Sequence, residues 1–120
     1  MRPTYHLVPA AVWAEVDRSL PYRAESLADE GFVHCTDGTD ELIATADRHY
    51  RDDPRAFVAL TVDLDRAGAA WTVEDERRIY PHVHGPIASD AIVAVQAVVR
   101  DPDGTFRGLA PDDHGPGSGG

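Results

Sequence analysis

Residues 56–63, Ala-Phe-Val-Ala-Leu-Thr-Val-Asp, restrict the fold of this chain more than any other segment, because they are nearly all apolar. A strand with one face in water alternates apolar and polar residues, whereas a continuous apolar run is typical of a strand covered on both faces. We therefore expect residues 56–63 to form a central strand of a sheet.

The rest of the pattern supplies two helices and further strands. Apolar residues at helical spacing predict a first helix that begins near Pro9 and stops by Pro21, and a second helix over residues 40–51. Residues 22–27 are interpreted as a loop or a short extended piece, and beyond residue 101 the pattern fades. Further strands are expected over residues 4–8, 31–36, 70–74 and 91–99. This order predicts an α+β fold with a mostly antiparallel, split sheet and the helices on one side.

The length of the chain, 120 residues, is enough for one hydrophobic core but not for two. We expect residues 1–110 to form a single α+β domain and residues 111–120, rich in Gly and Pro, to form a flexible tail. Cys35 is the only cysteine, which excludes an internal disulfide. Residues 1–9 do not resemble a signal peptide and no segment reaches membrane-spanning length, so we expect a cytoplasmic protein without a membrane partner.

The chain is strongly acidic, since 21 Asp and Glu residues against 11 basic ones give a formal net charge of −10. Such a field repels a nucleic-acid backbone, so a nucleic-acid partner is not expected. All the basic side chains are Arg, because the sequence contains no Lys. Arg makes forked contacts to carboxylates and phosphates, which suits a small anionic ligand held in a local cleft.

Residues 31–36, Gly-Phe-Val-His-Cys-Thr, carry the first candidate site. In a strand, alternation places Phe32, His34 and Thr36 on one face and Val33 and Cys35 on the other. His34 and Thr36 would then point into the same space beside an apolar anchor, which is an arrangement that can bind a ligand. The alternative interpretation is that His34 is a half-buried packing residue.

A second unusual segment, residues 77–87, places Arg77, His82 and His84 among prolines and a glycine. A loop that only connects two elements does not need several titratable side chains, so this segment is a candidate for binding or catalysis. Glu74, at the end of the preceding strand, is a candidate general acid or base beside these histidines. The same charged residues are also typical of a solvated turn.

Two other chemistries compete for these residues. A zinc site would need three histidines to converge on one point, and the spacing of the histidines matches no zinc motif, so no metal is expected. Nucleophilic catalysis by Cys35 is disfavoured, because His34 lies on the opposite face of the strand and cannot easily act as its base. Cys35 is expected to face the core as a small apolar side chain.

Several segments together resemble the bacterial domain of unknown function 952 family. In matching order over about residues 4–100, they are Tyr5-His6-Leu7, Trp13, residues 26–36, residues 58–63 and residues 80–87. The Gly-Phe-Val-His-Cys-Thr and Pro-His-x-x-Gly-Pro pieces are specific in combination. This family looks related to the ADP-ribosyltransferase fold, and especially to the NAD-dependent RNA 2′-phosphotransferases.

The resemblance implies an ADP-ribosyltransferase-like protein that acts on NAD, as its substrate, or on a related nucleotide. Tyr5 and His6 resemble a Tyr-His piece on the first strand of those transferases, which implies that His6 hydrogen-bonds a ribose of NAD. His34 and Thr36 would line the nicotinamide-ribose side of the cleft as catalytic residues. His82 would lie in the same cleft.

The remaining residues that the resemblance brings in are His84 and Arg77 on the cofactor side and Glu74 as the catalytic carboxylate. Arg77, Arg78 or Arg23 would meet the pyrophosphate through forked contacts. The chain departs from the family pattern in two places, since members usually have Ser where Thr36 stands and Tyr where His84 stands. No position clearly matches the motif that holds the catalytic Glu in related transferases, and Glu74 is the nearest candidate.

Three functional interpretations follow from the sequence. The first is the NAD-dependent transferase with a histidine-lined cleft, the second is a module that binds a nucleotide or small anion without turning it over, and the third is a metal-dependent hydrolase. A carboxylate within reach of His34 discriminates the first interpretation from the second. The sequence leaves the oligomeric state open.

Overall fold

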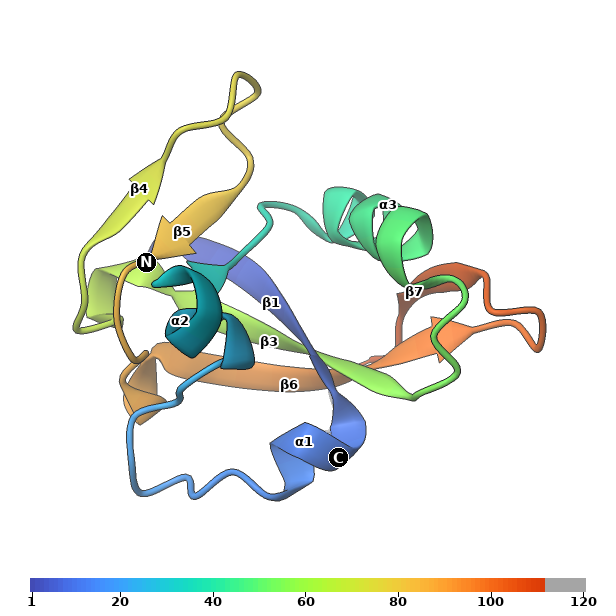
Figure 1. The fold of residues 1–120 in the computed structure, drawn as a ribbon, viewed down its shortest axis with the longest axis horizontal. Helices are drawn as coiled ribbons and strands as arrows, with labels where there is room; N and C mark the ends of the chain where they lie inside the picture. Colours follow the sequence, from blue (N-terminus) through green and yellow to red (C-terminus); the bar gives the residue numbers. More distant parts are fainter. Residues whose placement is uncertain (112–120) are drawn as a thin grey trace.

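The computed structural model describes residues 1–111. Its larger sheet has four antiparallel strands in the order β1-β3-β6-β7. These strands are β1 (Pro3–Pro9), β3 (Phe57–Asp63), β6 (Ile92–Arg100) and β7 (Phe106–Leu109). In Figure 1, β1, β3 and β6 run side by side across the middle of the molecule. β3 thus has a neighbour on each side, and Ala59, Leu60 and Val62 are fully buried, which confirms the expected central strand.

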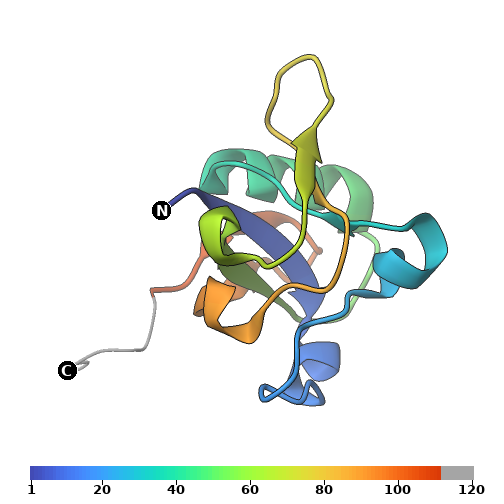
Figure 2. The ribbon, with the colours of Figure 1, turned by 90° about the vertical axis from the view of Figure 1, so that its left-hand side faces the viewer.

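A smaller antiparallel sheet has the order β2-β5-β4. It consists of β2 (Val33–His34), β4 (Trp71–Val73) and β5 (Pro81–Val83). Val33 and Val83 are fully buried on one face, whereas His34, His82 and Thr72 form a cross-strand row on the other. The loop between β4 and β5 projects away from the body of the molecule in both views (Figures 1 and 2).

Three α-helices and two 3-10 turns connect the strands. They are α1 (Ala10–Ala14), α2 (Glu25–Glu30), α3 (Thr39–Tyr50), η1 (Leu64–Arg66) and η2 (Ser89–Ala91). The buried stripe of α3, Leu42 and Ala46, packs toward β1 and β7, whereas Trp13 of α1 packs against the core on the opposite face of the large sheet. Figure 1 accordingly shows α3 above the strands and α1 below them.

The apolar core has two parts. The larger part fills the space between the two sheets and includes Leu60, Val62, Val33, Val83 and Ile87. The smaller part lies under α3 and contains Ala46, Phe57 and Phe106. The two sheets are therefore held together by apolar packing, and the larger sheet is covered on both faces, as the sequence of β3 indicates.

The expectation of two helices on one side of the sheet is wrong, since there are three α-helices and α1 and α3 lie on opposite faces of the large sheet. The first helix ends at Ala14 instead of near Pro21, because the Asp17 carboxylate accepts hydrogen bonds from the backbone and hydroxyl of Ser19 and stabilises a turn. Leu20, predicted to lie on the helix stripe, is 57% exposed. Residues 25–30, within a segment expected to be a loop, form α2, which ends at Gly31 with φ of 84° in the left-handed region that favours glycine.

The second correction concerns the end of the chain. Beyond residue 101, where the pattern was expected to fade, a turn with Gly104 at φ of 97° leads into β7. Phe106 of β7 is buried in the smaller core. The expected tail, residues 111–120, lies outside the described residues except for Pro111. Within residues 1–111, no helix has the length and apolar character needed to cross a membrane.

Candidate functional site

The two sheets meet at one point on β1. Tyr5 and Thr36 exchange two backbone hydrogen bonds, with N–O distances of 3.0 and 2.8 Å. One residue further along β1, Nδ1–H of His6 donates to the carbonyl oxygen of His34 at 2.7 Å. From there β1 continues into α1 while β2 leads back to α2, so the two strands diverge and a groove opens between them.

The groove has a volume of about 780 Å³ and is lined by residues of β1, α2, β2, α3 and β5. It brings together four of the residues that the sequence singled out, namely His6, His34, Thr36 and His82. These residues are far apart along the chain. The expectation of a histidine-lined cleft required them to lie around one hollow, and they do.

His6 lies at the bottom of the groove and is 7% exposed. Because a carbonyl can only accept, Nδ1 carries the proton, and Nε2 therefore accepts from the hydroxyl of Tyr22 at 2.8 Å. Burial lowers the pKa of His6 to about 4, against the opposing effect of the hydrogen bond to His34. His6 is thus neutral, and both ring nitrogens have partners within the chain.

His34 lies at the mouth of the groove, on the exposed face of β2. Its Nε2 is 3.0 Å from Oε2 of Glu30, and the two side chains are 52% and 51% exposed. Glu30 ends α2, and the left-handed backbone of Gly31 turns the chain so that Glu30 and His34 face each other. A carboxylate is therefore within reach of His34.

The rings around His34 form a packed cluster on the outer face of the small sheet. Phe32 stacks on His82 with ring centroids 4.0 Å apart and meets the edge of His34 at 4.7 Å. Burial and, second, the nearby His34 lower the pKa of His82. Both imidazoles are thus held at defined positions beside an aromatic ring.

The alternation predicted for residues 32–36 holds at most positions. Val33 and Cys35 are buried and His34 is exposed, as expected, whereas Thr36 is buried at 6% because it pairs with β1. Burial, and next the charge of Asp37, raise the pKa of Cys35 to about 12. The thiol therefore stays protonated and packs in the core, which confirms the structural role expected for Cys35.

Charge is distributed unevenly along the groove. The α2 side carries three carboxylates, Glu25, Asp29 and Glu30. The α3 side carries Arg48, His49 and Arg55, of which Arg55 is paired with Asp53 at 2.7 Å, and Asp75 also lines the groove. The guanidinium of Arg48 donates to the hydroxyl of Tyr80 at 3.3 Å, and that hydroxyl is 3.1 Å from Oγ1 of Thr45. Arg23, before α2, adds one basic group on the acidic side.

Four predicted site residues do not line the groove. The hydroxyl of Thr72 donates to Glu74 at 2.9 Å and is 2.8 Å from Nε2 of His84, both on the solvent side of the small sheet. Arg77 forms an ion pair with Glu41 of α3 at 2.9 Å. Tyr5 contributes its backbone to the junction of the sheets and not its ring to the groove.

Sequence reasoning missed Tyr22, Glu30, Arg48 and Tyr80. Glu30 has a local signal, since an acidic residue four positions before a histidine, across a glycine, is compatible with a helix end that faces a strand. Arg48 has no local signal, because an exposed arginine on a helix is ordinary and it lies off the apolar stripe of α3. Tyr22 and Tyr80 reach the site only through tertiary contacts, to His6 and to Arg48.

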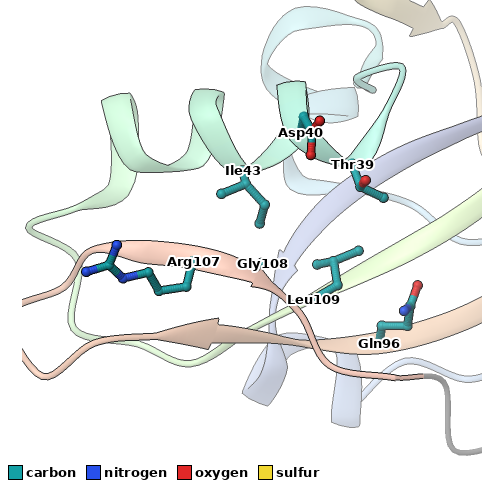
Figure 3. Close-up of a pocket in the computed structure, with 7 residues that line it drawn as sticks. All are labelled: Thr39, Asp40, Ile43, Gln96, Arg107, Gly108 and Leu109. Carbon is teal, nitrogen blue, oxygen red and sulfur yellow. The ribbon is translucent and has the colours of Figure 1, made fainter.

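A second, smaller hollow of about 450 Å³ lies between α3 and the end of the large sheet. Figure 3 shows Ile43 of α3 above Leu109 of β7, with Gln96 of β6 beyond them. Arg107, at its edge, is paired with Asp101 at 2.5 Å. No cluster of three or more His, Cys, Asp or Glu side chains suited to a metal ion occurs in residues 1–111.

Comparison with known proteins gives a family and a fold. The family described as "Protein of unknown function (DUF952)" matches residues 7–95. The crystal structure of protein CC0527 from Caulobacter crescentus has a TM-score of 0.67 with this chain at 23% identity, covering 88% of this chain and 93% of that protein, and a double mutant of CC0527 gives the same values. At this identity the likeness establishes the fold alone. No curated protein matches the chain.

Proposed function

The chain belongs to the protein family of unknown function DUF952, and we propose that it is an ADP-ribosyltransferase-like protein that binds NAD or a related nucleotide in the groove. In this proposal the chain breaks the bond between nicotinamide and ribose. The observation that carries the proposal is the groove itself, which collects His34, Thr36 and His82 between an acidic side and a basic side.

The charge pattern matches the charges of NAD. The dinucleotide carries a positive pyridinium ring at one end and a negative pyrophosphate in the middle. Arg48 on the α3 side supplies a guanidinium group for the pyrophosphate, whereas Arg55 is already paired with Asp53 at 2.7 Å. The carboxylates of α2 favour the pyridinium and, later, the positive charge that develops on the ribose as the bond breaks. Of the three arginines expected in this role, Arg23 lines the groove and Arg77 and Arg78 do not, and Arg48 joins Arg23 in the proposal.

The edge of β1 supplies a further contact for the nicotinamide end. The backbone N–H and C=O of Tyr5 point toward β2. Because backbone groups alternate in direction along a strand, the N–H and C=O of Leu7 point to the same side of β1. At Leu7, β2 no longer runs beside β1, so these two groups face the groove. An N–H donor and a C=O acceptor on one residue match the carboxamide of nicotinamide, which has an acceptor oxygen and a donor NH₂. The ring would then lie above His6, close to His34 and Thr36.

His6 has a positioning role in this proposal. Its two ring nitrogens are engaged by His34 and Tyr22, so the ribose contact implied by the family resemblance would require one of those bonds to open. Tyr22 donates to His6, which leaves its oxygen free to accept from a ribose hydroxyl. In this proposal the Tyr22 phenol, and not the His6 imidazole, makes the hydrogen bond to the ribose.

A non-catalytic binding module is the second candidate, and the position of Glu74 favours it. Glu74 does not line the groove and would not reach a ribose held there. In the binding module, the groove holds the nucleotide intact. The two candidates therefore differ in turnover and not in affinity.

Calorimetric titration with NAD, ADP-ribose and nicotinamide, followed by chromatography for released nicotinamide, tests the proposal. Binding of NAD with nicotinamide release supports the transferase, and binding without release supports the module. His34→Ala is expected to abolish the release, whereas Arg77→Ala, a matched surface change outside the groove, leaves it unchanged. Absence of binding by all three compounds would overturn both candidates.

A further inference from the structure

The contact between Glu30 and His34 has a defined proton arrangement. A carboxylate accepts, so Nε2 of His34 is the nitrogen that carries the proton at 3.0 Å from Oε2 of Glu30. In the neutral ring, Nδ1 then carries the lone pair. A carboxylate that holds one imidazole nitrogen orients the ring and leaves the other nitrogen as the proton acceptor, which is the arrangement of a general base.

The surroundings restrict the His34 ring. The edge of Phe32 lies 4.7 Å from it, measured between ring centroids, and the His82 ring lies 5.6 Å away on the opposite strand. Gly31 fixes the other partner, since its φ of 84° ends α2 directly after Glu30. Both members of the pair line the groove. An ordinary surface pair of Glu and His has none of these restraints and contributes little to stability.

We propose that Glu30 and His34 form a catalytic dyad whose acceptor substrate is an O–H group, either water or the hydroxyl of a larger molecule. This inference rests on the proposed function, because it assigns the second substrate of the same site. His34 is the catalytic base, and Glu30 is the positioning residue that replaces the expected Glu74.

The step balances in atoms and electrons. Nδ1 of His34 takes the proton of the acceptor O–H, and the acceptor oxygen forms a bond to C1′ of the ribose. The bond from C1′ to the nicotinamide nitrogen breaks, and its electron pair stays on that nitrogen, so the positively charged pyridinium leaves as neutral nicotinamide. The proton on His34 then passes to solvent, since the dyad is half exposed. With water as the acceptor the product is ADP-ribose.

Glu30→Gln tests the dyad, because it preserves the size of the side chain and removes its charge. Nicotinamide release is expected to fall about a hundredfold, the usual contribution of a general base, while the Kd for NAD rises a few-fold at most. The rate of the wild-type protein should also be lower in D₂O than in H₂O, and this solvent effect should change in Glu30→Gln, which keeps a measurable rate. Glu76→Gln, an exposed carboxylate outside the groove, serves as the matched control.

A second measurement does not depend on NAD. Diethyl pyrocarbonate acylates neutral imidazoles, and mass spectrometry follows the rate at His34, with the exposed His49 as an internal reference. In the dyad, Glu30→Gln slows acylation of His34 several-fold and leaves that of His49 unchanged. Unchanged acylation overturns the dyad even if NAD is cleaved. Slower acylation in a protein that neither binds nor cleaves NAD supports the dyad and overturns the proposed function instead.

Discussion

The buried imidazole of His6 accepts a hydrogen bond from the phenol of Tyr22 at 2.8 Å, and the two rings are tilted with centroids 5.4 Å apart. This contact joins the first strand to the segment that precedes α2. Together with the bond from His6 to the His34 carbonyl, it places one neutral histidine at the point where three parts of the chain converge. His6 therefore contributes to stability as well as to the site.

The first prediction concerns pH. The pKa of His6 is about 4 in the folded protein and 6.5 in the unfolded chain, so between these values the unfolded chain binds the proton and the folded chain does not. Stability is fully present above pH 6.5 and is lost as the pH falls toward 4. The free energy of unfolding should fall by about 2 kcal/mol from this group between pH 7.5 and pH 5.

Urea titration at both pH values measures this difference. In His6→Gln the difference between the two pH values should shrink by that amount, whatever the stability of the variant at pH 7.5. His49→Gln, at an exposed histidine, is the control and should retain the full difference. An unaltered pH dependence in His6→Gln would show that another group causes it.

The second prediction separates binding from stability at the mouth of the groove. His34→Ala should abolish NAD binding and leave the melting temperature nearly unchanged, because the side chain is half exposed and packs only at its edge. Phe57→Ala should do the reverse and cost about 3–5 kcal/mol, since Phe57 is 3% exposed in the core under α3. A large loss of stability in His34→Ala would identify it as a packing residue.

The third prediction concerns the basic side of the groove. Arg48→Ala should weaken binding of NAD and of inorganic pyrophosphate about tenfold, because a charge-assisted hydrogen bond is lost. The affinity of the wild-type protein should also decrease more steeply with salt than that of the variant. Calorimetry in 50 and 500 mM NaCl measures both effects. Equal affinity in the wild-type protein and Arg48→Ala would mean that the phosphates bind elsewhere.

The fourth prediction concerns a buried hydroxyl. Thr4 is fully buried on β1, and its Oγ1 has no hydrogen-bond partner among the described residues. Thr4→Val keeps the shape and removes this uncompensated polar atom, so it should raise the free energy of unfolding by about 1 kcal/mol. Thr45→Val should lower it, because the Thr45 hydroxyl bonds Tyr80. Denaturant titration of the two variants gives the comparison, and destabilisation by Thr4→Val would contradict the prediction.

The fifth prediction concerns the turn before β7. Gly104 has φ of 97°, and a Cβ at this position would collide with the carbonyl of Arg51. Gly104→Ala should therefore destabilise the protein by more than 1 kcal/mol. Gly108→Ala in β7, where a Cβ would meet open space, is the matched control. Similar melting temperatures for the two variants would show that the turn relaxes without cost.

Elements with a strong local pattern could be predicted from the sequence. The apolar run of β3 identified the central strand, and the stripe of Leu42 and Ala46 identified α3 within one residue at each end. α2 could not be predicted from periodicity because it has only six residues, and its end depends on Gly31. β7 was missed although a Pro-Asp-Gly turn precedes it, because only Phe106 of that strand is buried.

The candidate site was likewise predictable only in part. His34, Thr36, His82 and His6 were identified as residue types with unusual chemistry in apolar strands, and they do line one groove. Glu74 was the carboxylate expected beside His34, and Glu30 was missed, because only the way α2 ends at Gly31 and the pairing of β2 with β5 bring Glu30 to His34. Burial of His6 depends on Tyr22, a contact across 16 positions with no local signature.

Among residues 1–111, Tyr5 and Thr36 provide the backbone bridge between the two sheets. Two peptide groups alone would leave the angle between the sheets free, so this angle is set by the side chains around the bridge. The buried core between the sheets and the bond from His6 to the His34 carbonyl fill that role. The width of the groove is thus determined by packing behind it and not by residues that line its mouth.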